Sequence, residues 1–136
     1  IKLGTRLQEE VFSARRMRLN IGDLLLTSER LGVDFVDITD INEEGLLYND
    51  EDMKKLLKSL RLKIDGLFLP HCNFGTEYEC ARLAKELNVP VLLWGPLDER
   101  PDENGVRLRD TQCGLFATGK VLRRFRIPFT YMTNCR

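Results

Sequence analysis

The clearest fold signal lies in the stretch IDGLFLPHCNFGTEYECARLAKELNVPVLLW, residues 64–94. Its first apolar run, Ile64 to Leu69, is typical of a central parallel strand that is covered on both faces. From Thr76, the spacing of a capping box opens a helix whose apolar residues recur at helical intervals. Pro90 to Trp94 then forms a second buried strand. Strand, helix and strand in this order predict a unit of two parallel strands joined by a helix.

The same alternation continues toward both ends of the chain. Upstream, we expect a strand at Ile1 to Arg6, a helix from about Ser13, a strand at Val33 to Ile38 and a helix around Met53 to Leu60. Downstream, we expect a helix from about Asp110 to Phe125 and a strand at Ile127 to Tyr131. Five strands separated by four helices predict an α/β fold. Its expected form is a flavodoxin-like, three-layer α/β/α sandwich with a five-stranded parallel sheet of order 2-1-3-4-5.

Length and composition limit the class of protein. The 136 residues suffice for one domain, 1–136, and the 43% hydrophobic and 31% charged content is ordinary for a globular chain. Twenty-one basic and 21 acidic side chains cancel, so nothing favours a nucleic acid or a membrane surface as partner. Four cysteines without a C-x-x-C pair and a single histidine argue against a structural zinc and favour free thiols in a cytoplasmic protein.

In such sheets, ligands bind beyond the carboxyl ends of the strands, where the winding reverses. This rule selects Thr5-Arg6 after the first strand and Pro70 to Gly75 after the third. The second segment brings together an imidazole, a thiol, an amide and a ring, in His71, Cys72, Asn73 and Phe74. A simple βα turn is the competing interpretation. A metal site at His71 and Cys72 lacks further ligands, and Cys72 as a nucleophile lacks a base other than its own neighbour.

Three other features have plainer explanations. Trp94 is expected in the core, and the basic residues at the end of the last helix complement its dipole rather than bind nucleic acid. The basic residues are Lys120, Arg123, Arg124 and Arg126. The polar segment Gly95 to Arg109 is too long for a minimal connection, and long loops of this kind are often functional.

Several blocks resemble L-fucose isomerase-like proteins. The segment Asp65 to Glu77 (DGLFLPHCNFGTE) carries the resemblance, which continues through the four blocks that follow. They are VDFVDITDIN (33–42), PVLLWGPLDERP (90–101), RLRDTQCGLFATGKVLRRF (107–125) and PFTYMTNC (128–135).

The resemblance implies that the chain is the first, N-terminal domain of a longer sugar isomerase that interconverts an aldose and a ketose with Mn²⁺. The metal ligands belong to later domains, so the chain alone is expected to bind no metal and to be inactive. Arg6 in Gly4-Thr5-Arg6 resembles an arginine that contacts sugar. Cys72 stands where the family has a tryptophan that reaches into the neighbouring subunit's site, and this difference leaves the sugar open. The expected role is substrate capping and oligomerisation, with neighbouring subunits and an aldose or ketose as partners.

Three other classes of protein are alternatives. A sugar-binding sensor domain of the periplasmic-binding-protein type shares the expected topology but needs a second lobe to close on its ligand. A flavodoxin-like electron carrier needs a hydroxyl-rich phosphate loop after the first strand, which Thr5 to Glu9 does not supply. A receiver domain needs an aspartate where this chain has Pro70-His71.

Overall fold

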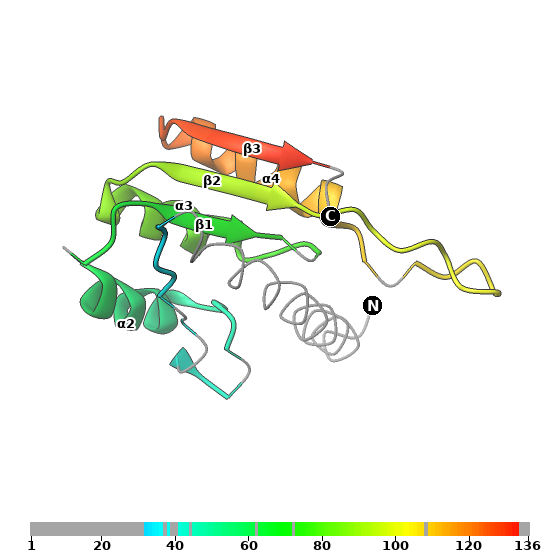
Figure 1. Cartoon of the computed structure of the whole chain (residues 1–136), viewed down its shortest axis with the longest axis horizontal. Helices are drawn as coiled ribbons and strands as arrows, with labels where there is room; N and C mark the ends of the chain where they lie inside the picture. The colour runs from blue at the N-terminus through cyan, green and yellow to red at the C-terminus, as the bar shows by residue number, and fades with distance from the viewer. Residues whose placement is uncertain are drawn as a thin grey trace.

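The computed structural model describes residues 32–36, 38, 41–43, 45–61, 63–71, 73–107 and 109–133. Its elements follow in the order α2 (Asp50–Leu60), β1 (Leu67–Pro70), α3 (Glu77–Leu87), β2 (Val91–Gly95), α4 (Thr111–Arg124) and β3 (Phe129–Thr133). The three strands form one parallel sheet of order β1-β2-β3, with α3 and α4 packed along one face (Figure 1). The predicted β-helix-β unit is therefore present, with β1 and β2 in register from Leu67↔Val91 to Pro70↔Trp94.

Two apolar clusters hold these elements together. The first lies between the sheet and helices α3 and α4, with Ala81, Ala84, Val91, Leu93, Leu115 and Leu122 at its centre. The second packs α2 on the other side of α3 through Met53, Leu56, Leu60 and Leu83. Leu67 of β1 contacts both clusters, so the start of the sheet joins them. Strand β2 is largely buried, whereas β1 is partly buried throughout and lies at one side of the described sheet. The expectation of a central strand covered on both faces at 64–69 is therefore not met in the described residues.

Local chemistry fixes the ends of the helices. The Asn49 side chain accepts a hydrogen bond from the Asp52 backbone nitrogen at 2.9 Å and caps α2, and Asp110 caps α4 through the Cys113 nitrogen at 3.2 Å. Helix α3 ends at Asn88, which adopts the left-handed conformation with φ 51°. The predicted capping box at Thr76 is wrong, because that hydroxyl makes no cap bond and donates instead to the Leu47 carbonyl.

The prediction of a five-stranded, flavodoxin-like sandwich with strand order 2-1-3-4-5 is wrong. The part of the chain that the structure describes contains three strands and three helices, and its sheet ends at β1 and β3. The expected strand at Val33 to Ile38 is absent, since residues 33–36 and 38 have no regular structure and residues 33–36 are exposed. β-Propensity reflects packing on a pleated surface, and this segment packs on β1 through the ring of Phe35 against Phe68, 6.3 Å between centroids, without joining its ladder. The strand expected at Ile1 to Arg6 and the helix from Ser13 lie outside the described residues.

Candidate functional site

The loops after β1 and β2 leave the sheet at the same edge, because parallel strands place their carboxyl ends together (Figure 1). The His71 backbone nitrogen donates to the Trp94 carbonyl at 2.8 Å and extends the pairing one residue past β1. Trp94 is 4% exposed and stacks on Phe68 with 5.7 Å between ring centroids, which agrees with the core position expected for it. The edge is therefore a rigid platform for the residues that follow.

His71 is the most constrained side chain of this edge. Only 5% of its surface is exposed, and its Nε2 atom has no hydrogen-bond partner among the residues that the structure describes. Burial lowers the pKa of His71 from 6.5 to about 4, so the imidazole is neutral at neutral pH. A Cβ atom at Gly75 would lie 3.3 Å from the His71 Nδ1, so glycine at this position gives the ring its space.

Asn73 and Phe74 lie in the same loop, closer to solvent. The Asn73 Oδ1 accepts a hydrogen bond from the Phe74 backbone nitrogen at 2.9 Å, which fixes the turn, and 39% of Phe74 is exposed. The first turn of α4 presses on this loop, because a Cβ atom at Gly114 would lie 1.9 Å from the Asn73 carbonyl oxygen. Because Gly114 has no side chain, the first turn of α4 can pack directly against the loop after β1.

The structure accordingly brings together three of the five predicted site residues, His71, Asn73 and Phe74. Cys72 and Arg6 lie outside the described residues, and the assignment of all five residues to a sugar-binding site stays a prediction.

A residue that sequence reasoning missed as a site residue lies at the base of the long loop after β2. Arg109 is 5% exposed, and its Nε donates to Glu99 Oε2 at 2.8 Å while its Nη2 donates to the Leu97 carbonyl at 3.3 Å. Its Nη1 has no partner within the described part of the chain. The available signal was an acidic pair directly after a buried strand and an arginine directly before a helix cap.

We call residues 96–107 the arm, because they project beyond the carboxyl edge of the sheet (Figure 1). The Thr111 hydroxyl donates to the Pro96 carbonyl at 2.6 Å, and the Arg109–Glu99 pair closes the base. At the tip, Asp102 Oδ1 accepts from the backbone nitrogens of Asn104 at 2.9 Å and Val106 at 2.8 Å. The arm is thus pre-organised by its own polar groups although its tip is exposed.

The start of α4 is a poor site for an anionic ligand, although helix N-termini commonly attract anions. The Thr111 nitrogen already donates to the Asp98 carboxylate, at 3.2 and 3.3 Å, and the Cys113 nitrogen donates to Asp110. A hydrogen bond from the Cys113 thiol to Asp110 and partial desolvation raise the pKa of Cys113. Burial raises the pKa of Cys80 to about 12, so neither thiol is a nucleophile at neutral pH.

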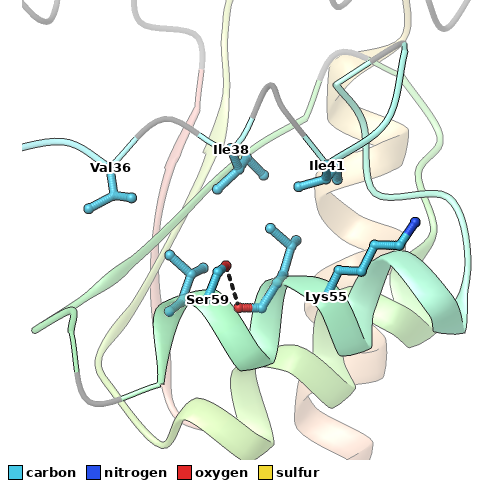
Figure 2. A pocket seen from close by; sticks show the side chains of 7 residues that line it. Val36, Ile38, Ile41, Lys55 and Ser59 are labelled. Atoms are coloured by element: carbon cyan, nitrogen blue, oxygen red, sulfur yellow. Dashed lines mark hydrogen bonds between the residues drawn. The ribbon is translucent and has the colours of Figure 1, made fainter.

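Two of the hollows in the described structure are lined by residues other than His71, Asn73 and Phe74. Figure 2 shows the first, about 260 Å³, in which Val36, Ile38 and Ile41 point toward helix α2. Its polar members are few, and the Ser59 hydroxyl is bonded to the Leu56 carbonyl at 3.0 Å. The second, about 550 Å³, lies at the opposite edge of the sheet between residues 84–91 and 125–130. The edge that carries His71 therefore presents a surface to a ligand, rather than one of these hollows.

Within the described residues, no group of three or more histidine, cysteine, aspartate or glutamate side chains is arranged to hold a metal ion. A search of the same residues finds no helix that is both long and apolar enough to cross a membrane.

Comparison with protein families gives one result. The family model described as fucose/sulfoquinovose isomerase, N-terminal domain, matches residues 8–136. Comparison with curated proteins and with solved structures returns no match.

Proposed function

Because the chain belongs to the family of fucose/sulfoquinovose isomerase N-terminal domains, we propose that it is the substrate-capping and oligomerising domain of a longer aldose–ketose isomerase. The carboxyl edge of the sheet, with His71, Asn73 and Phe74, is the surface that meets the sugar. The observation that carries this proposal lies after β1, where the His71 ring is buried and Gly114 of α4 closely approaches the Asn73 carbonyl.

The side chains of this loop suit a sugar. Asn73 has amide groups that bond hydroxyls in both directions, and Phe74 exposes part of an aromatic face, the usual surface for the C–H side of a sugar ring. Such a domain covers a site that another domain or a neighbouring subunit completes. On this proposal, the domain binds and orients the substrate and excludes water from it.

Manganese belongs to the proposal for the longer enzyme only. When bound there, a divalent metal supplies a Lewis acid that polarises the oxygens of the open-chain sugar. The described residues of this chain do not form a ligand set for it. We therefore place metal binding and proton transfer in other domains, and we assign no reaction step to this chain.

The cytoplasm is the proposed location. The cysteines whose side chains are described, Cys80 and Cys113, are both free, as is usual where thiols stay reduced.

The test is the kinetics of the longer enzyme with manganese on fucose, arabinose and sulfoquinovose. Phe74→Ala is compared with Tyr78→Ala, which removes an exposed aromatic ring at the second residue of α3, outside the proposed surface. We expect Phe74→Ala to raise KM about tenfold, the equivalent of about 1.4 kcal/mol, with kcat little changed, and Tyr78→Ala to leave both constants unaltered.

Equal effects of the two substitutions would contradict the proposal. The isolated 136-residue chain should neither isomerise these sugars nor bind them saturably. Saturable sugar binding by the isolated chain would instead favour a sensor domain of the periplasmic-binding-protein type.

A further inference from the structure

A hollow of about 550 Å³ lies at the amino edge of the sheet, opposite the arm and the proposed sugar-facing loop (Figure 1). The end of α3 and the start of β2 bound it on one side, and the end of α4 and the start of β3 bound it on the other. Pockets for small molecules usually have volumes of about 300–1,000 Å³ and apolar walls with a few polar groups. The hollow agrees with this description in its size and in its lining.

Two phenylalanine rings form part of the wall, and neighbouring elements hold both of them. Phe125 packs edge-on against Tyr78 of α3, with 5.6 Å between the ring centroids. Phe129 packs against α4, where a Cβ atom at Gly119 would lie 3.3 Å from its Cζ atom. Both rings also contact the apolar cluster between the sheet and the helices. The wall is therefore fixed by the fold, and it presents flat apolar surfaces.

Two cationic side chains complete the lining. Lys85 lies in the last turn of α3, with its Nζ 5.6 Å from the centroid of the Phe125 ring, and Arg126 follows the end of α4. Within the described residues, neither Lys85 nor Arg126 pairs with a carboxylate, and no aspartate or glutamate lines the hollow. The hollow thus combines aromatic walls with two positive charges that no acidic side chain neutralises.

The backbone at Arg126 is unusual for an arginine. At the end of α4, the Arg126 nitrogen donates to the Arg123 carbonyl and the Ile127 nitrogen to the Leu122 carbonyl, each at 3.0 Å. This ending places residue 126 in the left-handed conformation, with φ 58°, where glycine is the usual residue. An arginine there costs conformational free energy that a glycine would not cost. Residues held at such a cost are often found at ligand-binding sites.

The charges around the hollow favour an anion. The carboxyl ends of α3 and α4 lie at this edge, and each is equivalent to about half a negative charge. Glu86 adds one negative charge but does not line the hollow. The two helix ends carry four basic residues, Lys85, Arg123, Arg124 and Arg126. The positive charges outweigh the negative ones, so the edge attracts an anion.

We propose that this hollow binds a small aromatic carboxylate, at a site separate from the sugar-facing loop. Lys85 and Arg126 hold the carboxylate, for which the planar guanidinium offers two parallel N–H donors. The ring of the ligand lies against Phe125 and Phe129. A neutral ring lacks the charge interaction, and a bare anion lacks the contacts with the wall, so tight binding needs both parts of the ligand.

Titration of the ¹⁵N-labelled 136-residue chain with 2-naphthoate, followed by its amide resonances, tests the proposal. The matched probes are 2-naphthylmethanol, a similar ring without the charge, and inorganic phosphate, an anion without a ring. We expect 2-naphthoate to bind with a Kd of about 1 mM, ordinary for a ligand of its size, and to shift the amides of Val89, Ile127 and Phe129. The other two probes should bind at least about tenfold more weakly.

Two substitutions separate binding from folding. Arg126→Gly removes the cation and relieves the left-handed backbone, so it should raise the Kd of 2-naphthoate about tenfold while the Tm stays at or above that of the wild type. Lys85→Gln should also raise the Kd about tenfold. The matched control is Arg124→Gln, which removes an exposed cation at the same helix end but outside the lining, and it should change the Kd less than about twofold.

Equal binding of 2-naphthylmethanol and 2-naphthoate would overturn the proposal, because the hollow would then be an apolar groove without selectivity for an anion. Shifts confined to amides outside the lining would also overturn it, as would a Kd that neither Lys85→Gln nor Arg126→Gly raises. None of these results concerns the KM of Phe74→Ala in the longer enzyme, because the two surfaces lie at opposite edges of the sheet.

Discussion

At the scale of single residues, burial sets the chemistry of His71. The imidazole lies at an edge where a solvent-exposed histidine would titrate near neutral pH, yet desolvation keeps the pKa of the ring at about 4. A neutral ring leaves the edge without a positive charge, and its burial keeps it from solvent. His71 is thus suited to holding the loop after β1 in place rather than to acid catalysis at pH 7.

The titration of His71 should be visible by itself, because it is the single histidine of the chain. We expect its Cε1 proton resonance to keep the chemical shift of a neutral ring down to about pH 5 and to titrate near pH 4. A midpoint near 6.5 would contradict the buried position of the ring.

The same shift predicts how stability depends on pH. The pKa of His71 is lower in the folded chain than in the unfolded chain, so between pH 6.5 and 4 the unfolded chain binds more protons. The contribution to stability is therefore complete above pH 6.5 and is lost as the pH falls through 4, by about 3 kcal/mol at most. Urea unfolding of the wild type and of His71→Gln at pH 7 and 4.5 isolates this loss, since the variant has no group that titrates at position 71.

At the scale of elements, the arm is ordered by contacts within itself and at its base. The buried Arg109 joins Glu99 and the Leu97 carbonyl, so the two ends of the arm are tied together. The tip is fixed by the Asp102 carboxylate, which satisfies two backbone donors. Order in an exposed polar loop costs conformational entropy, which the hydrogen bonds of the arm offset.

We expect Asp102→Ala to free the tip of the arm without unfolding the domain. The amides of Asn104 and Val106 lose their acceptor and should exchange about fivefold faster, because each such bond contributes about 1 kcal/mol. Glu103→Ala, which removes the neighbouring exposed carboxylate, is the matched control and should leave both rates unchanged. Unchanged protection in Asp102→Ala would show that other groups hold the turn.

The sequence predicts elements well where burial and local chemistry agree. The apolar runs at 64–69 and 90–94 became β1 and β2 with shifts of a few residues, because apolar side chains of these strands pack against α3 and α4. Val33 to Ile38 also has β-branched and aromatic residues but pairs with no strand among the described residues, and propensity cannot supply a partner. Thr76 has the spacing of a capping residue, yet its hydroxyl donates a hydrogen bond to the carbonyl of Leu47, 29 residues earlier in the chain.

The candidate site stays a prediction. The local pattern did place His71, Asn73 and Phe74 directly after a parallel strand. The reversal of winding that selected this loop is not seen in the described sheet, whose order is β1-β2-β3. Arg109 was missed because its partner, Glu99, lies ten residues away across an irregular arm whose path no periodicity encodes. The close approach of Gly114 to the Asn73 carbonyl was equally hidden, because it depends on how α4 docks.

At the scale of the whole molecule, helix α3 links the two apolar clusters. Its Ala81 and Ala84 face the sheet and α4, and its Leu83 faces α2. Because α3 contributes side chains to both clusters, unfolding of one cluster should destabilise the other. The pairing of Arg82 with Asp50 adds a polar link between α3 and α2 on the surface.

We therefore expect the domain to unfold in one cooperative step, with truncations in either cluster lowering the same transition. Leu56 and Leu122 are 1% and 0% exposed and belong to different clusters, so Leu56→Ala and Leu122→Ala should each cost about 3 kcal/mol through lost contacts and the cavity left behind. Circular dichroism for the helices and Trp94 fluorescence for the sheet should give coincident unfolding curves in both variants. If Leu56→Ala instead separates the two curves, α2 unfolds independently of the sheet, and α3 does not couple the clusters.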